Sequence, residues 1–151
     1  MKFIRQSNIS AIIFLLLLYG CAPLIGSHSQ TAYENATSLK AEAIAILGKA
    51  NTSYSENKES VETIELKIEK AYEFVKGIPN NQISTKQWEI LKDPNGLLMG
   101  KFFKRWRARK TLSKPIIEQY KRLAAEAFDE IICLEANKKS ATDCSQEGGS
   151  N

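Results

Sequence analysis

The feature of this sequence that most constrains its fold is the spacing of its apolar residues between positions 31 and 137. They recur at steps of three and four, which places them along one side of an α-helix. The longest such run lies in residues 114–137 and comprises Ile116, Tyr120, Leu123, Ala124, Ala127, Phe128, Ile131 and Leu134. No stretch alternates between apolar and polar residues convincingly enough to indicate a strand. The sequence therefore predicts an all-α fold.

Interruptions of this pattern divide the chain into three long helices and one or two short ones. The long helices are expected at 31–50, 56–76 and 114–137, and the short ones at 85–91 and 97–110. Stretches rich in glycine, proline, asparagine and serine separate them, because these residues end helices or favour turns. Packing of the apolar stripes against one another would give a small helical bundle.

The short helix at 85–91 carries its own start signal. Ser84 is expected to cap the helix, with Gln87 three residues later completing a capping box. Ile83 before the cap and Trp88 four residues after it fit the hydrophobic staple that often accompanies such a start.

The first 21 residues have a different character from the rest. Lys2 and Arg5 give a positive start, and residues 11–19 form an unbroken apolar run. This run is shorter than the about 20 apolar residues that a membrane-spanning helix needs. It leads into Leu18-Tyr19-Gly20-Cys21, an aliphatic residue, a spacer, a small residue and a cysteine. That order resembles the signal peptide and lipobox of bacterial lipoproteins. An uncleaved N-terminal anchor is the alternative.

The resemblance to lipoproteins implies a division of the chain. Residues 1–20 would be the signal peptide, and Cys21 would receive lipid on its sulfur before the chain is cleaved in front of it. Residues 21–30, which contain proline, glycine and serine and no charge, are then expected to be a lipidated tether. Residues 31–139 would form the helical domain, and the polar residues 140–151 a flexible tail.

The resemblance also implies a location. Ala22 follows the lipid site, which is similar to the sorting pattern of outer-membrane lipoproteins. The expected location is therefore the cell membrane, anchored by lipid, and specifically the outer membrane with the domain facing the periplasm. The partners would be the membrane itself, through the lipid anchor, and a protein of the cell envelope. No nucleic acid is expected there.

The three cysteines suggest a disulfide. If Cys21 carries lipid, Cys133 and Cys144 remain, and an exported chain meets an oxidising compartment. The alternative is that Cys133 serves as a small buried apolar side chain, as free cysteines often do.

Positive charge is concentrated in one segment. The net charge is +4 at pH 7, but residues 97–114 contain seven cations and no acid. Without these seven and the two cations of the signal peptide, the remainder carries a charge of −5. A basic segment on an otherwise acidic protein suggests an anionic partner.

The basic segment at 97–110 allows several interpretations. Its cations are interleaved with aromatic residues, which suits an anionic membrane surface. Nucleic acid is the least favoured partner. The structural alternative is a core helix that buries Phe102 and Trp106 and leaves its cations in solvent or paired with the acidic second helix. The candidate surface residues are Lys101, Lys104, Arg105, Arg107, Arg109 and Lys110.

Motifs that carry catalytic or cofactor chemistry do not occur in this sequence. His28 is the sole histidine and has no neighbouring metal-ligating cluster. The glutamates of the second helix are expected to form a solvated face. We therefore expect no metal, no cofactor and no enzymatic activity. The function that fits best is a lipid-anchored helical module of the cell envelope with a binding or structural role. The alternative is a membrane-active protein that uses residues 97–110 on anionic lipid.

Overall fold

The structure is a computed structural model that describes residues 26–138 and residue 144. The predicted signal peptide, Cys21 and most of the predicted tail lie outside the described residues. Every element in the described part is helical. The elements are α2 (Gln30–Gly48), the 3-10 helix η1 (Lys49–Asn51), α3 (Tyr54–Lys76), α4 (Gln82–Lys92), α5 (Met99–Arg109) and α6 (Lys114–Asn137). The prediction of an all-α bundle with three long helices and one or two short ones is confirmed, and the described residues contain two short α-helices, α4 and α5.

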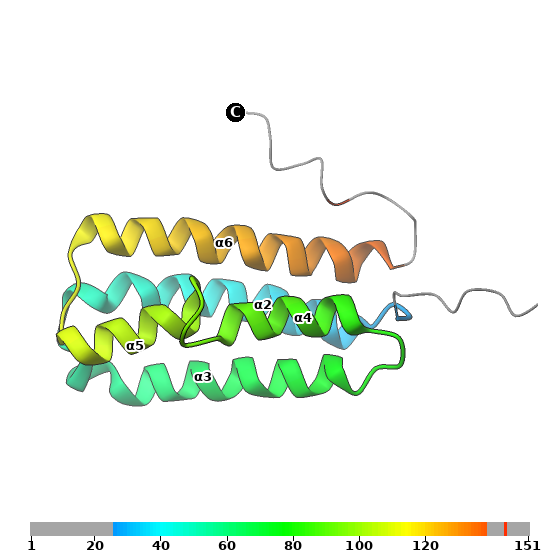
Figure 1. Cartoon of the computed structure of the whole chain (residues 1–151), viewed down its shortest axis with the longest axis horizontal. Coiled ribbons are helices and arrows are strands. Elements are labelled where there is room, and N and C mark those ends of the chain that lie inside the picture. Colours follow the sequence, from blue (N-terminus) through cyan, green and yellow to red (C-terminus); the bar gives the residue numbers. More distant parts are fainter. Residues whose placement is uncertain (1–25, 139–143, 145–151) are drawn as a thin grey trace, which may run out of the picture.

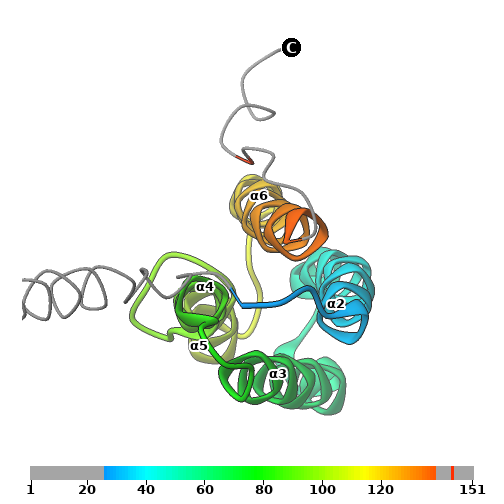
Figure 2. The ribbon, with the colours of Figure 1, turned by 90° about the vertical axis from the view of Figure 1, so that its right-hand side faces the viewer.

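The helices form four columns, because α4 and α5 follow one another along a single column (Figure 1). We call this pair the α4/α5 column. It packs against α3 and α6, and α2 packs against the same two helices. Viewed from the end, α2 and the α4/α5 column therefore lie diagonally opposite each other across the core (Figure 2).

Aromatic side chains fill the centre of the core. Trp88, Phe102, Trp106 and Phe128 have 0% of their surface exposed. Trp88 packs edge-on against Phe128, with 5.9 Å between ring centroids, and Phe102 packs in the same manner against Tyr120 at 5.1 Å. Edge-on packing is a favourable arrangement of two rings. Burial of one such side chain contributes roughly 1.5–3 kcal/mol, so these rings fix the α4/α5 column against α6.

Most helix boundaries fall close to the predicted ones. α6 begins and ends where its periodicity predicted, with Ser113 as its N-cap and Pro115 in its first turn, where a missing N–H costs little. α2 ends at Gly48 because the chain tightens there into the 3-10 turn η1. α3 begins two residues earlier than predicted, and α5 is shorter than predicted by two residues at its start and one at its end.

The predicted start of α4 is wrong. The helix begins at Gln82 with Asn81 as its N-cap residue, three positions before the expected first residue. Ser84 lies inside the helix and is fully buried, and its hydroxyl donates a hydrogen bond of 2.6 Å to a carboxylate oxygen of Glu135. Ile83 is 42% exposed and packs in no staple. The predicted capping box does not form, because the buried Ser84 hydroxyl needs an acceptor and finds it in the distant Glu135.

The break between α4 and α5 depends on a tight turn and a close approach. The backbone N–H of Asn95 donates to the Asp93 carboxylate at 2.8 Å, and that of Gly96 donates to the Asp93 carbonyl at 3.1 Å. Gly100, in the first turn of α5, lies against the last turn of α4. A Cβ at this position would be 2.1 Å from the carbonyl oxygen of Lys92. Only glycine lets the two helices stack this closely.

Two backbone hydrogen bonds join the turns at the other end of the bundle. The N–H of Tyr54 donates to the carbonyl of Lys110, and the N–H of Leu112 donates to the carbonyl of Ala50, both at 2.8 Å. They connect the α2–α3 turn with the α5–α6 turn. Lys110 adopts a φ of 66° in this junction.

The last residues of the predicted tether are fixed on the bundle instead of flexible. Gly26 is buried against the start of α4, where a Cβ would lie 2.9 Å from the carbonyl oxygen of Pro79. The chain then crosses the end of the bundle to α2 (Figure 2). Ser29 caps that helix, accepting a hydrogen bond of 3.3 Å from the N–H of Ala32. The predicted tether is therefore held on the bundle from Gly26 onward.

Candidate functional site

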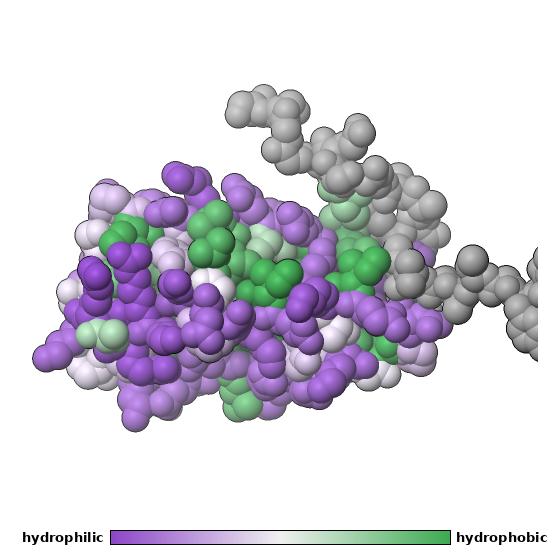
Figure 3. Space-filling view, in the orientation of Figure 1, coloured by the Kyte–Doolittle hydropathy of each residue, from purple (hydrophilic) through white to green (hydrophobic). Residues whose placement is uncertain are grey.

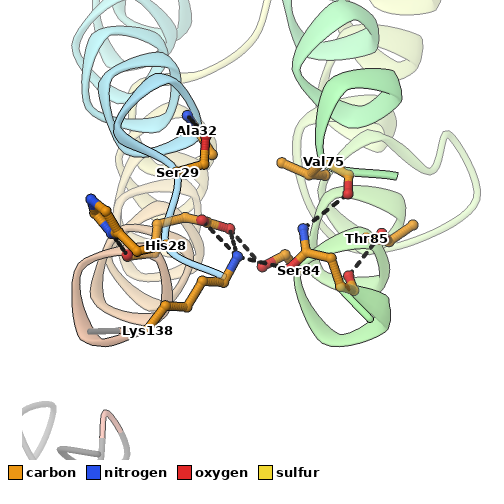
Figure 4. Close-up of polar contacts among 9 residues, drawn as sticks. His28, Ser29, Ala32, Val75, Ser84, Thr85 and Lys138 are labelled. Atoms are coloured by element: carbon orange, nitrogen blue, oxygen red, sulfur yellow. Dashed lines mark hydrogen bonds and ion pairs between the residues drawn. The ribbon is translucent and has the colours of Figure 1, made fainter. Parts of the chain in front are cut away.

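A buried polar cluster lies at the end of the bundle where the chain enters it (Figure 4). We call it the entry cluster, and its members are His28, Asn81, Ser84, Glu135 and Lys138. They come from the segment before α2, the start of α4 and the end of α6. The cluster therefore joins three parts of the chain that are far apart in sequence.

The centre of the entry cluster is an ion pair without exposure to solvent. The ammonium of Lys138 lies 2.7 Å from both carboxylate oxygens of Glu135, and both side chains are 0% exposed. Lys138 also donates to the side-chain oxygen of Asn81 at 2.7 Å. Ser84 donates to the same carboxylate. Buried charges are tolerated when they are paired and hydrogen-bonded in this way.

The remaining contacts of the entry cluster join it to α3 and to the segment before α2. Asn81 donates from its side-chain nitrogen to the carbonyl of Val75 at 2.9 Å, which ties the end of α3 to the start of α4. His28 Nδ1 lies 2.8 Å from the carbonyl oxygen of Glu135, and the buried His28 Nε2 has no hydrogen-bond partner among the described residues. These contacts fix the incoming chain on α6.

The entry cluster was not predicted from the sequence. Its hydrogen bonds join residues up to 107 positions apart. The one local signal is the spacing of three between Glu135 and Lys138, which is common on exposed helix surfaces as well. Nothing in the sequence marks this pair as buried.

A disulfide lies at the same end of α6. The structure joins Cys133 and Cys144, with 2.16 Å between the sulfur atoms and 5.8 Å between the Cα atoms. Cys144 is the single described residue beyond 138. Cys21, the predicted lipid site, lies outside the described residues.

The aromatic residues of the basic segment belong to the core. Phe102 and Trp106 are fully buried, as are Met99 and Phe103 to within 1%. The indole N–H of Trp106 donates to the carbonyl of Thr52 at 3.2 Å. The core-helix interpretation therefore holds for the aromatic half of the pattern, and the aromatic rings are not available at the surface.

Arg107 differs from its basic neighbours because it binds within the protein. Its Nη2 lies 3.1 Å from a carboxylate oxygen of Glu65 on α3, and its Nε donates to the Tyr54 hydroxyl at 3.0 Å. These interactions, the hydrogen bond to Tyr54 foremost, hold the pKa of Arg107 above its ordinary value. Arg107 is therefore a link between α5 and α3 and not a free surface cation.

The other five cations form what we call the cationic surface, which consists of Lys101, Lys104, Arg105, Arg109 and Lys110. Within the described part of the chain, none of the five makes an ion pair; Lys104 donates to the side-chain oxygen of Asn95 at 2.9 Å. Elsewhere most cations are neutralised by pairs such as Lys40–Asp129, Lys67–Glu42 and Lys121–Glu118. Positive charge is thus left uncompensated on one segment of the molecule.

A groove of about 940 Å³ runs between α3, α4 and α5. Three of its acids form ion pairs: Glu65 with Arg107, Glu69 with Lys92 at 2.7 Å, and Glu89 with Lys86 at 3.0 Å. The hydrogen bond from Lys86 lowers the pKa of Glu89. Glu65 and Glu69 therefore join α3 to α5 and α4, whereas Glu89 pairs within α4.

The chain was compared with family models, curated proteins and solved structures, and none of the three comparisons found a match. Across the described residues, no three acidic, histidine or cysteine side chains come together as a metal site would require. None of the helices between residues 26 and 138 combines the length and the apolar character of a membrane crossing.

Proposed function

We propose that this protein is a lipid-anchored module of the bacterial cell envelope, in which a helical bundle with a binding or structural role is held at a membrane through Cys21. The observation that carries the proposal is the order Leu18-Tyr19-Gly20-Cys21 after a charged start and a short apolar run. Several acyl chains, at about 0.8 kcal/mol for each buried methylene, would make this attachment stable.

The way in which the chain enters the bundle supports this role. Gly26 is the first residue that the structure describes, and it packs on the bundle. Four residues lie between it and Cys21, so five backbone steps join the two; we call this stretch the leash. At about 3.3–3.6 Å for each residue, a leash of this length reaches at most about 18 Å. The entry cluster then resists pulling on the leash, because it fixes His28 and the start of α2 to α6.

Metabolic labelling with a palmitate analogue tests the proposal. The wild-type protein should be labelled, and Cys21→Ser should not. The matched control is the double variant Cys133→Ser, Cys144→Ser, which should keep the label because it leaves the proposed lipid site intact. Equal labelling of wild type and Cys21→Ser would refute the proposal. Fractionation of the two membranes then tests the outer-membrane location suggested by Ala22.

The second candidate is a membrane-active protein that uses residues 97–110 on anionic lipid. The uncompensated charge of the cationic surface favours it. Because Phe102 and Trp106 lie in the core, such a protein could not insert these rings without opening the bundle. Release of dye from anionic vesicles by the purified protein distinguishes this activity from simple attachment.

A further inference from the structure

The outward side of the α4/α5 column combines exposed apolar groups with the uncompensated cations. Five large apolar side chains of the described residues are exposed, and three of them lie on this column or in its turn: Ile83, Ile90 and Leu97, at 42%, 50% and 73%. Lys101, Lys104, Arg105 and Arg109 continue along the same column. Figure 3, in which this column faces the viewer, shows apolar groups among hydrophilic ones on this side.

The spacing of these residues places them on common faces. Ile83 and Ile90 are seven residues apart on α4, which is two helical turns. Lys101, Lys104 and Arg105 are three and four residues apart on α5, and such residues are neighbours on a helix surface. The opposite sides of both helices are occupied by the core, because Trp88 and Phe102 point there. The apolar half and the cationic half therefore follow one another along one side of the bundle.

The leash begins beside this column. Gly26 packs against Pro79, Ile78 and Asn81, the residues that lead into α4. In the end view the first described residues lie next to α4, and the chain then crosses to α2 (Figure 2). A lipid on Cys21 would thus hold the α4 end of the column within about 18 Å of the membrane, whereas α2 lies across the core from it.

We infer that the outward side of the α4/α5 column is the surface that lies on the membrane in which Cys21 is anchored, and that this membrane presents anionic headgroups. The inference rests on the proposed lipidation. Ile83, Ile90 and Leu97 would contact the interface, and the cations of α5 would bind headgroup phosphates at the end far from the lipid. Interfacial binding of this kind combines apolar contact with electrostatic attraction.

The charges of the column favour a lipid surface over a second copy of the chain. Two copies that met through this side would bring eight cations together, and like charges facing each other oppose association. An anionic leaflet compensates the same charges. Its attraction acts within a Debye length of about 10 Å at 0.1 M salt, so it holds the cations of α5 only when the column lies along the surface to which the leash joins its α4 end.

The test uses the lipidated protein, purified from host membranes and reconstituted in vesicles. A single environment-sensitive dye is attached to Ile90→Cys on the column or to Ala41→Cys, an exposed position on α2. With vesicles that contain phosphatidylglycerol, a spin-labelled lipid should quench the dye at position 90 several-fold more than the dye at position 41. High salt should reduce this difference for the otherwise unchanged protein.

Charge variants provide the matched comparison. Replacement of Lys101, Lys104, Arg105 and Arg109 by glutamine should abolish the preference for position 90. Replacement of Lys49, Lys58, Lys70 and Arg122 by glutamine removes the same charge from other elements. It should leave the stronger quenching at position 90 unchanged. Equal quenching at positions 90 and 41 in anionic vesicles, or a difference insensitive to salt, would overturn the inference.

Failure of the inference is distinguishable from failure of the proposed function. If the protein carries acyl chains and floats with the vesicles but quenching is equal, only the orientation is wrong. If Cys21→Ser floats as the wild type does and neither protein carries lipid, the lipid anchor itself is wrong, and with it the orientation.

Discussion

Gly100 is the residue on which the stacking of α4 and α5 depends most directly. A Cβ there would lie 2.1 Å from the Lys92 carbonyl oxygen, which is backbone and cannot turn away. Gly100→Ala should therefore lower the free energy of unfolding by about 1–3 kcal/mol, the usual cost of overpacking. Urea denaturation measures this change.

Gly48 is the control for this substitution. No atom lies within 4 Å of a Cβ built at Gly48, and the residue has helical backbone angles at the end of α2. Gly48→Ala should stabilise the protein by about 0.4–1 kcal/mol, because alanine restricts the unfolded chain. Equal effects of the two alanines would contradict the close approach of the helices.

The buried ion pair of the entry cluster predicts strong coupling between two residues. Lys138→Met leaves Glu135 buried without its cation and should cost about 3–5 kcal/mol of stability. The double variant Lys138→Met, Glu135→Met should recover most of this loss, because both charges are then absent. A double-mutant cycle from urea denaturation checks the coupling, and additive effects would show that the pair is open to solvent.

At the level of the elements, the two sides of α5 are expected to contribute differently to stability: its core side packs, and its outer side carries charge. Phe102→Ala should cost about 3–5 kcal/mol, because it opens a cavity in a fully packed core. Arg105→Gln and Arg109→Gln, on the outer side of the same helix, should change stability by less than about 0.5 kcal/mol. Thermal denaturation of the three variants tests this division, which fails if the arginine variants are as unstable as Phe102→Ala.

The elements that could be predicted from the sequence are those governed by local patterns. α6 matches its predicted bounds because its apolar period runs unbroken between a serine–proline start and a pair of lysines. α4 does not, because Ser84 donates its hydrogen bond to Glu135, 51 residues away, and the helix begins after Asn81, whose side chain makes no capping hydrogen bond. Local capping rules cannot anticipate such a competitor.

For the candidate site, the cations of the basic segment could be predicted from the sequence, but the residues that they contact could not. The cations of residues 97–110 were identified from composition alone, whereas the separation of Arg107 from the others depends on Glu65 and Tyr54 of another helix. The entry cluster escaped prediction for the same reason, since its hydrogen bonds exist only after three distant segments meet. Long-range polar contacts leave no periodic trace in a sequence.

At the scale of the whole molecule, the point where the chain enters the bundle and the cationic surface lie at different places along its length. The entry cluster and the disulfide lie at the end where the chain enters the bundle, and the cationic surface lies on α5, further along the same column as α4. A short leash at one end and an uncompensated charge further along would give the bundle a preferred direction relative to a membrane.

The intact mass of the protein isolated from host membranes tests this account most directly. We predict a chain that begins at Cys21, carries acyl groups at that residue, and weighs two hydrogens less than its thiol form because Cys133 and Cys144 are joined. A mass that corresponds to a chain beginning at Met1, or to a chain processed before Cys21 without lipid, would contradict it.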